Sequence, residues 1–250
     1  MQDLEIFKAF ERSEQPCYKH TTYFDTYEHL FSRYRGQAIT FVEIGILDGG
    51  SLFMWREYFG PKARIIGVDL NPEAKKWEQH GFEIFTGSQS NPEFWHSFIS
   101  EIGSIDIVLD DGGHTYQQQI VTAECLLDSI SDGGLLVVED CHTSYMPGFG
   151  DHARSFINYA KTWVDRINSR FGKFYAAKAQ GDRRVWSIEF YESIVAFRVN
   201  RKSSMALSAP IRNKNPETGA KDYRHEDAAD SIEASQRLAN FVKAAFEIYK

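Results

Sequence analysis

The chain has 250 residues, of which 42% are hydrophobic, and its formal net charge at pH 7 is -7. This length and hydrophobic content suit one α/β domain with appendages. The acidic balance argues against a nucleic-acid-binding protein, because phosphate contacts need clustered lysines and arginines, so a small substrate is expected instead.

Three cysteines, Cys17, Cys125 and Cys141, lie far apart in the chain and form no CxxC pair. Neither a disulfide framework nor a structural zinc site is therefore expected, which fits a reducing compartment. The N-terminus lacks the apolar core of a signal peptide, and no stretch approaches the ~20 apolar residues of a membrane span. We expect a cytoplasmic protein without a membrane span.

Residues 1–38 form an N-terminal segment with an aromatic-rich helical stretch at 23–34. This segment could pack on the main domain, contact a second subunit, or form a lid at the acceptor pocket. Together with a predicted C-terminal helix, its aromatic surface suggests a homo-oligomer.

Residues 39–200 alternate β-branched runs with amphipathic segments, a rhythm typical of strand, crossover helix and parallel strand. The expected strands are 39–45, 64–70, 82–87, 105–111 and 135–140. The expected helices are 51–60, 72–81, 92–102, 115–130 and 154–170. A hairpin follows over 185–200, with its turn at Glu192-Ser193. Residues 201–226 are predicted to form a polar loop, and 227–249 a final helix within the appendage 201–250.

This order of elements predicts a Rossmann-like doubly wound α/β sheet, mostly parallel, with an antiparallel C-terminal hairpin and helices on both faces. In such a sheet, ligands bind outside the carboxyl ends of the strands. The first strand exits into EIGILDGGS, where Gly45 allows close approach of a ligand and Ser51 can cap the next helix.

A nucleoside-containing cofactor is the expected ligand. Asp69 follows Gly45 by 24 residues and ends the second strand, where a carboxylate can bind both ribose hydroxyls. Ser88 and Gln89 after the third strand are further candidate contacts, as is Asp110. A dinucleotide would need a site for its pyrophosphate, whereas Glu43 can orient the amino end of S-adenosylmethionine, which we favour.

Acids gather after the fourth and fifth strands, in VLDDGGH and VVEDCH. One such pair could simply cap a helix. Two pairs on neighbouring strands would repel unless a cation neutralised them, so we expect a divalent metal. An all-oxygen set of Asp111, Glu139 and Asp140 suits Mg²⁺.

Three further side chains are assigned roles beside this metal set. His114 is three residues after Asp111, and its ordinary pKa near neutrality suits a general base. His142 and Tyr145 are possible substrate contacts.

With VEIGILDGGSLFMWREYF, GVDLNP, VLDDGGHT and GGLLVVEDCHTSY, residues 19–199 resemble the class I S-adenosylmethionine-dependent methyltransferases. They are most similar to the metal-dependent sugar O-methyltransferases of macrolide biosynthesis and their relatives in surface polysaccharide clusters. The resemblance implies Mg²⁺ on Asp111, Glu139 and Asp140, with His114 as the base. A small-molecule, sugar-containing acceptor is expected, but the resemblance does not carry over its identity. The chain departs from the family's usual Gly-Asp-Gln after the third strand, since it has Gly87-Ser88-Gln89.

Two other classes of function remain open at this point. An Fe(II) oxygenase of the cephalosporin-hydroxylase-like type could use His114, Asp111 and His142 as a two-histidine, one-carboxylate set. A nucleoside-binding regulator without turnover would keep the cofactor loop alone.

Overall fold

The computed structural model describes residues 1–171, 182–206, 208–216, 219, 237–240 and 242. The chain divides into two compact units, Met1–Ser208 and Ala209–Lys250. In the second unit, residues 237–240 are helical, and most of the predicted helix 227–249 lies outside the described residues. The fold below is that of the first unit.

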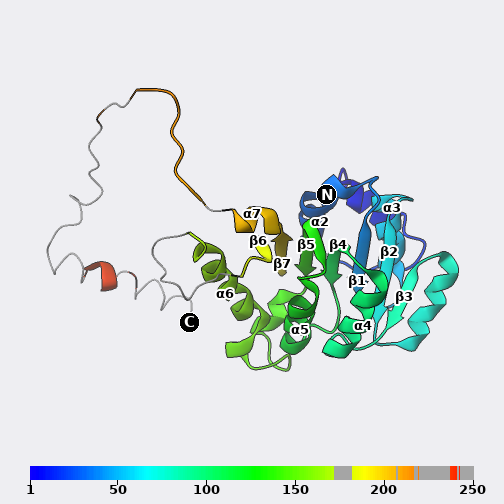
Figure 1. Cartoon of the computed structure of the whole chain (residues 1–250). Helices are drawn as coiled ribbons and strands as arrows, with labels where there is room; N and C mark the ends of the chain where they lie inside the picture. Colours follow the sequence, from blue (N-terminus) through cyan, green and yellow to red (C-terminus); the bar gives the residue numbers. More distant parts are fainter. Residues whose placement is uncertain (172–181, 207, 217–218, 220–236, 241, 243–250) are drawn as a thin grey trace. The chain divides into compact units, whose positions relative to one another are not determined.

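A seven-stranded sheet forms the centre of this unit, in the order β3-β2-β1-β4-β5-β7-β6 (Figure 1). The first five strands pair in parallel, and β7 runs antiparallel to both β5 and β6. The predicted doubly wound sheet with an antiparallel hairpin is confirmed. The strands are β1 Thr40–Ile44, β2 Arg64–Asp69, β3 Glu83–Thr86, β4 Ile105–Asp110, β5 Ile130–Val138, β6 Val185–Tyr191 and β7 Ile194–Val199.

Helices cover both faces of the sheet (Figure 1). One face packs against α1 Glu5–Glu11, α2 Tyr23–Phe31, η1 Ser32–Tyr34, α3 Gly50–Phe59 and η2 Pro72–His80; the other packs against α4 Pro92–Ile102, α5 Tyr116–Leu126 and α6 Phe156–Asn168. Short elements complete the unit: η3 Cys141–Tyr145, η4 His152–Arg154 and α7 Arg201–Met205. Along β1, Phe41 joins the first core and Val42 the second, as the two-residue period of a strand requires.

Several element boundaries differ from the prediction. The predicted α-helix over 72–81 is a 3-10 helix, and its two buried residues, Ala74 and Trp77, are three apart, which matches the 3-10 repeat. The helix predicted over 115–130 ends at Leu126, and β5 begins at Ile130. The glycine-containing stretch that was expected to end the helix is therefore part of β5. Gly133 adopts φ 94° there, and the pairing of β5 with β4 is irregular at this point. The start of the predicted polar loop is helical instead, over Arg201–Met205.

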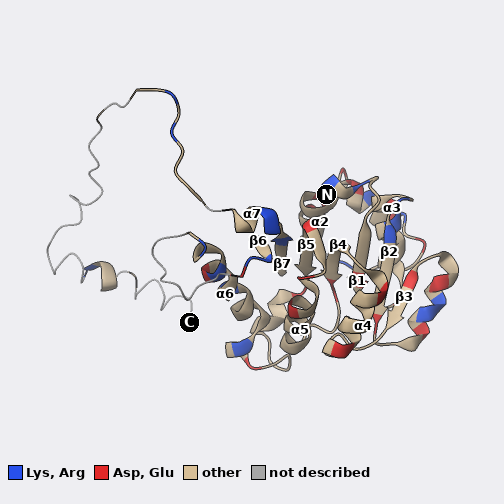
Figure 2. Cartoon of the chain, viewed as in Figure 1, with Lys and Arg blue, Asp and Glu red and all other residues tan. Residues whose placement is uncertain are grey.

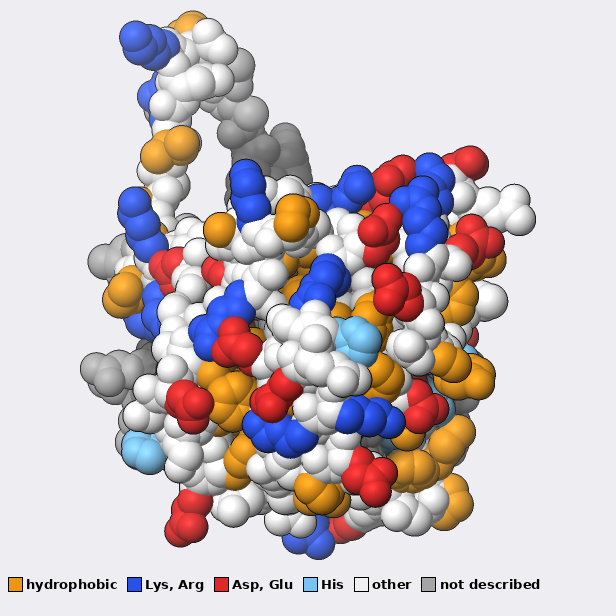
Figure 3. Space-filling model, turned by 90° about the vertical axis from the view of Figure 1, so that its right-hand side faces the viewer, with side chains coloured by type: hydrophobic (Ala, Val, Ile, Leu, Met, Phe, Trp, Pro, Cys, Tyr) orange, Lys and Arg blue, Asp and Glu red, His pale blue; other side chains and the backbone are white. Residues whose placement is uncertain are grey.

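Charged groups are distributed in mixed sign over the unit. Acidic and basic residues alternate around η2 (Figure 2). The face on the β3 side likewise mixes acidic, basic and hydrophobic side chains (Figure 3). Among the helices that the structure describes, none has the length and apolarity that crossing a membrane would require.

The N-terminal segment packs on the domain. On α2, Tyr27 and Phe31 are fully buried, and their rings lie 5.2 and 5.6 Å from that of Trp55 on α3. Residues 1–38 therefore share the main hydrophobic core of the first unit.

Because Phe31 is surrounded by other rings, replacing it with alanine opens a cavity. We expect Phe31→Ala to lower the free energy of unfolding by about 3–5 kcal/mol, measured by urea denaturation. The half-exposed Val164 on α6 is the control, and Val164→Ala should change the value by less than about 0.5 kcal/mol. Equal stability of the two variants would contradict docking of the segment.

Candidate functional site

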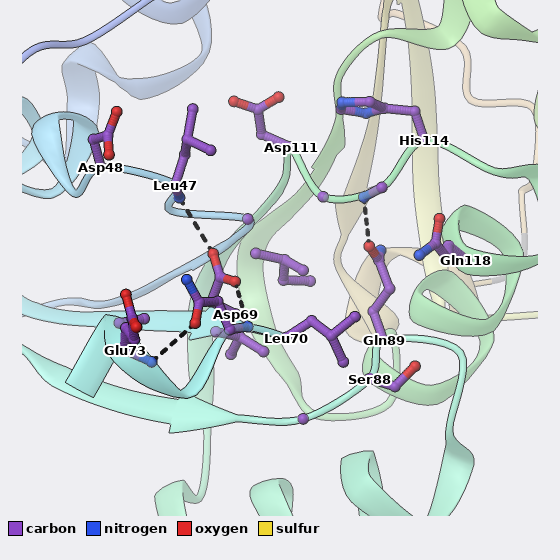
Figure 4. A pocket seen from close by; sticks show the side chains of 18 of the residues that line it. Leu47, Asp48, Asp69, Leu70, Glu73, Ser88, Gln89, Asp111, His114 and Gln118 are labelled. Atoms are coloured by element: carbon purple, nitrogen blue, oxygen red, sulfur yellow. Dashed lines mark hydrogen bonds between the residues drawn. The ribbon is translucent and has the colours of Figure 1, made fainter.

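A cavity of about 600 Å³ opens at the carboxyl ends of the parallel strands (Figure 4). It is the place where a doubly wound sheet binds its ligand. The predicted site residues that line it are Gly45, Asp69, Ser88, Gln89, Asp111 and His114.

The loop after β1 is held in shape by Asp69. The Asp69 Oδ2 atom accepts hydrogen bonds from the backbone N–H groups of Ile46 and Leu47, at 3.0 and 3.2 Å, and Figure 4 shows the bond from Leu47. Gly45 has φ 82°, and a Cβ atom there would lie 2.2 Å from the Asp111 carbonyl oxygen. Only glycine therefore fits at this position, where the loops after β1 and β4 meet.

Two leucines in this cavity have unusually exposed side chains. Leu47 is 77% exposed and Leu70 is 69% exposed, and both lie beside Asp69 (Figure 4). Exposed apolar side chains inside a cavity gain most when a flat apolar ligand covers them. A purine base with its ribose against Asp69 fits this chemistry.

Gln89 and Asp110 are bonded to each other. Gln89 Nε2 donates to Asp110 Oδ1 at 2.9 Å, and Gln89 Oε1 accepts from the Gly113 N–H at 2.8 Å. Asp110 is buried on the α4 and α5 side of the sheet, and burial raises the pKa of its carboxyl. It does not line the cavity, so its role as a cofactor contact stays a prediction.

Glu43 and Ser51 form a second buried pair, on the α3 side. Ser51 Oγ donates to Glu43 Oε2 at 2.6 Å, and Trp55 Nε1 donates to Glu43 Oε1 at 3.1 Å. The expected capping role of Ser51 is wrong, because α3 begins at Gly50 with Gly49 as its N-cap. Neither Glu43 nor Ser51 lines the 600 Å³ cavity, and their contact with a cofactor stays a prediction.

The acids after β4 and β5 meet at the rim of this cavity. Asp111, His114 and Asp140 each offer one ligand atom, and these atoms lie within 4.8 Å of one another. Glu139 lies deeper, with 1% exposure, and accepts a hydrogen bond from the Tyr27 hydroxyl. Tyr23 similarly donates to Asp140 Oδ1, at 2.5 Å.

Lys19 is a central residue that the sequence reasoning missed. Its side chain is 2% exposed, and its Nζ atom lies 2.5 Å from Asp111 Oδ2, 3.1 Å from Glu139 Oε2 and 3.7 Å from Glu43 Oε1. Burial alone would lower the pKa of Lys19, but Asp111 and Glu139 raise it well above its ordinary value. Lys19 is thus a buried ammonium shared by three carboxylates.

Backbone strain concentrates around the same acids. Within the described part of the chain, positive φ at residues other than glycine occurs at Leu47, His114, Asp140 and Ser193. Leu47 and His114 line the cavity, and the Ser193 hydroxyl, 2.9 Å from the Tyr23 hydroxyl oxygen, donates to it. Such conformations cost of order 1–3 kcal/mol each and cluster at functional sites.

His114 lies with one ring nitrogen toward Asp140. Its Nε2 atom is 3.3 Å from Asp140 Oδ2, whereas its buried Nδ1 atom has no hydrogen-bond partner among the described residues. Of the two ring nitrogens, Nε2 is therefore the one that faces the acids.

The two predicted substrate contacts lie outside the 600 Å³ cavity. His142 Nδ1 is 2.5 Å from Ser193 Oγ, and the Tyr145 ring, 65% exposed, lies 5.7 Å from that of His152. Their contact with an acceptor stays a prediction.

Residues 42–141 match a family of known proteins described as a methyltransferase domain. The chain is 34% identical over 199 residues to the 8-demethyl-8-alpha-L-rhamnosyl tetracenomycin-C 2'-O-methyltransferase of Streptomyces olivaceus, covering 73% of this chain and 51% of that protein. It is also 34% identical over 134 residues to the mycinamicin VI 2''-O-methyltransferase of Micromonospora griseorubida, covering 51% and 33%. The chain thus spans about half, or less, of these relatives' lengths.

Among solved structures, the chain is similar to the MycE methyltransferase from the mycinamycin biosynthetic pathway in complex with Mg and SAH. The TM-score is 0.74 at 24% identity, over 91% of this chain and 60% of MycE. The likeness supports the Rossmann-like fold. Residues 42–141 are thus similar to a methyltransferase domain, and the chain is similar to antibiotic sugar O-methyltransferases over part of their length.

Removing the shared ammonium leaves three carboxylates at the strand ends without their common cation. We expect Lys19→Met to lower the free energy of unfolding by about 3–5 kcal/mol, the usual cost of breaking a buried ion pair from one side. Chemical denaturation at neutral pH measures it.

Lys62, which is exposed, provides the matched control, because Lys62→Met removes the same charge from the surface. A Lys19→Met protein as stable as the Lys62→Met protein would contradict the assignment of Lys19 as the site's buried counter-ion.

Proposed function

We propose that this chain is a Mg²⁺-dependent O-methyltransferase that moves the methyl group of S-adenosylmethionine to a hydroxyl of a sugar or a sugar-containing small molecule. The observation that carries the proposal is the position of Asp111 and His114. Both line the cavity suited to a nucleoside, and both belong to the potential metal-binding group with Asp140. The cofactor and the deprotonated hydroxyl of the acceptor would therefore lie side by side at the rim of the 600 Å³ cavity.

The donor set fits a hard divalent cation. Asp111 and Asp140 face the rim with side chains about one-fifth exposed, and Glu139 lies behind them. Carboxylate oxygens are the ligands that Mg²⁺ prefers, and Asp111, Glu139 and Asp140 would hold it. When bound, Mg²⁺ lowers the pKa of a coordinated hydroxyl, and S-adenosylmethionine supplies the methyl group.

The residues of the chain would contribute binding, orientation and proton transfer. Asp69 shapes the cofactor loop and accepts hydrogen bonds from ribose. His114 accepts the proton of the acceptor hydroxyl at Nε2, and Asp140 stabilises the imidazolium that forms. Holding acceptor and cofactor in one fixed geometry supplies much of the remaining rate.

The type of acceptor is inferred from the relatives. The Streptomyces relative is named for a 2'-O-methyl transfer to an alpha-L-rhamnosyl tetracenomycin, and the Micromonospora relative for mycinamicin VI. We infer a sugar-containing acceptor of antibiotic or surface polysaccharide biosynthesis.

The iron oxygenase alternative is less well supported. The clustered donor set within the described residues contains one imidazole and two carboxylates, whereas that alternative requires two histidines. His142, its candidate second imidazole, is bonded to Ser193. A cytoplasmic location and a homo-oligomer remain inferences from sequence.

Metal dependence is the first test of the proposed function. With a panel of rhamnosylated compounds as acceptors, we expect S-adenosylhomocysteine formation to stop in EDTA and to return with Mg²⁺. Asp111→Asn should lose turnover but still bind S-adenosylhomocysteine in calorimetry. Undiminished turnover in EDTA would rule out a required metal. Oxygen consumption without any formation of S-adenosylhomocysteine would favour the oxygenase.

Proton transfer is tested at His114. We expect His114→Ala to lower kcat by a factor of about 10²–10⁴, the usual contribution of a general base, while S-adenosylhomocysteine affinity stays within a few-fold of wild type. Raising the pH should partly restore the rate of this variant, because hydroxide replaces the missing base. A kcat equal to that of wild type would place the base elsewhere.

A further inference from the structure

His114 and Asp140 face each other from two loops, and both have a strained backbone. Their φ angles are positive, 57° for His114 and 53° for Asp140, and the His114 Nε2 atom lies 3.3 Å from Asp140 Oδ2. A residue with a side chain avoids this conformation unless the surrounding structure imposes it. Some contact must therefore hold the loops after β4 and β5 against each other.

The His114 ring is not fixed in the way that is usual for a functional histidine. Such a ring is normally oriented by a hydrogen bond at its second nitrogen, often to a carbonyl or carboxylate oxygen. The Nδ1 atom of His114 is buried and has no hydrogen-bond partner among the described residues. The direction of the ring must then depend on where the backbone of His114 is held.

Thr143, in η3, supplies a contact to that backbone. Its hydroxyl oxygen lies 3.1 Å from the His114 carbonyl oxygen and 2.8 Å from the Asp140 carbonyl oxygen. Thr143 is 3% exposed, so water competes little for these bonds. Because the hydroxyl has one proton, the two carbonyl groups share it, and both strained residues are drawn to one point.

Bonds from α5 fix this part of the β5 loop in turn. The Tyr116 hydroxyl donates to the Thr143 carbonyl oxygen at 3.0 Å, and Gln119 Nε2 donates to the Glu139 carbonyl oxygen at 3.0 Å. Neither bond uses a side chain assigned to the metal or the cofactor. The arrangement therefore exists before either binds, as a well-positioned site requires.

A purely local role for the Thr143 hydroxyl explains only one of its two contacts. Threonine side chains in helical turns often bond the carbonyl oxygen three or four residues earlier, and the bond to Asp140 is of this kind. The bond to His114 spans 29 residues and joins the exits of two strands. It is the contact that the hydroxyl adds beyond its own turn.

Resting on the proposed function, we propose that Thr143 is a positioning residue, whose hydroxyl holds the base His114 against Asp140 and so aligns the imidazole ring with the acceptor hydroxyl. Thr143 touches no reactant in this role. A displacement of the base by about 1 Å can lower the rate by about 10²-fold, whereas cofactor affinity does not depend on it.

The test compares Thr143→Val, which keeps the shape of the side chain without its hydroxyl, with Thr143→Ser, which keeps the hydroxyl. We expect Thr143→Val to lower kcat by about 10- to 100-fold, while the KM for the acceptor and the affinity for S-adenosylhomocysteine stay within about threefold of wild type. Thr143→Ser should have a kcat within about threefold of wild type, because the bond to His114 is retained.

Thr162 on α6 provides the matched control. It is exposed, and its hydroxyl donates to the Tyr159 carbonyl oxygen, three residues earlier, at 2.7 Å. Thr162→Val removes a bond of the same local kind from the surface and should leave kcat unchanged. Urea denaturation checks that each variant is folded. If Thr143→Val does not fold, Tyr116→Phe replaces it, since it frees the Thr143 carbonyl oxygen, and the same pattern of kcat and affinity is expected.

A readout without turnover separates this inference from the proposed function. NMR spectra of protein with ¹³C-labelled histidine Cε1 are recorded at one fixed pH with S-adenosylhomocysteine, and the His114 signal is identified by its absence in His114→Ala. We expect this signal to move in Thr143→Val and to keep its place in Thr143→Ser and Thr162→Val. That result would support the positioning role even if no acceptor were methylated.

Three outcomes would overturn the positioning role. The first is a His114 signal that Thr143→Val leaves in place, and the second is an equal loss of kcat in Thr143→Val and Thr143→Ser. The third is methyl transfer by Thr143→Val at the kcat of wild type, which would refute this inference and leave the proposed O-methyltransferase intact.

Discussion

The site depends on one interaction, the burial of the Lys19 ammonium among carboxylates from three strands. Glu43 belongs to β1, Asp111 follows β4 and Glu139 follows β5. Burying such acids together without a cation would force protons onto them, because each carboxylate disfavours the ionised form of the next. Lys19 supplies positive charge at their centre and ties the N-terminal segment to the sheet.

Two tyrosines extend this arrangement along α2. Tyr23 donates to Asp140 and Tyr27 donates to Glu139, so each of the two acids after β5 has a fixed hydrogen-bond donor. Burial and the negative charge of Asp111 raise the pKa of Glu139 well above its ordinary value. Fixed donors of this kind orient the two carboxylates, as partners behind a metal site do.

The sheet and the acids were predictable from sequence because both arise from local patterns. Strands 39–45 and 105–111 read as apolar runs, and the polar residues that end them meet at one edge of a parallel sheet. Lys19 could not be found in this way, since its two nearest partners, Asp111 and Glu139, lie 92 and 120 residues away. Tyr23 and Tyr27 are spaced by four residues on one face of α2, but Lys19 precedes that helix and carries no such signal. The wrong role for Ser51 came from a helix that begins one residue earlier than expected, at Gly50.

The charge at the strand ends is only partly balanced by the protein itself. Glu43, Asp111, Glu139 and Asp140 carry four negative charges when ionised, and Lys19 offsets one of them. Because three negative charges would remain, either some of these carboxyl groups hold a proton or a further cation joins them. The same lysine that makes the acids tolerable in the core therefore leaves room for a cation at their exposed side.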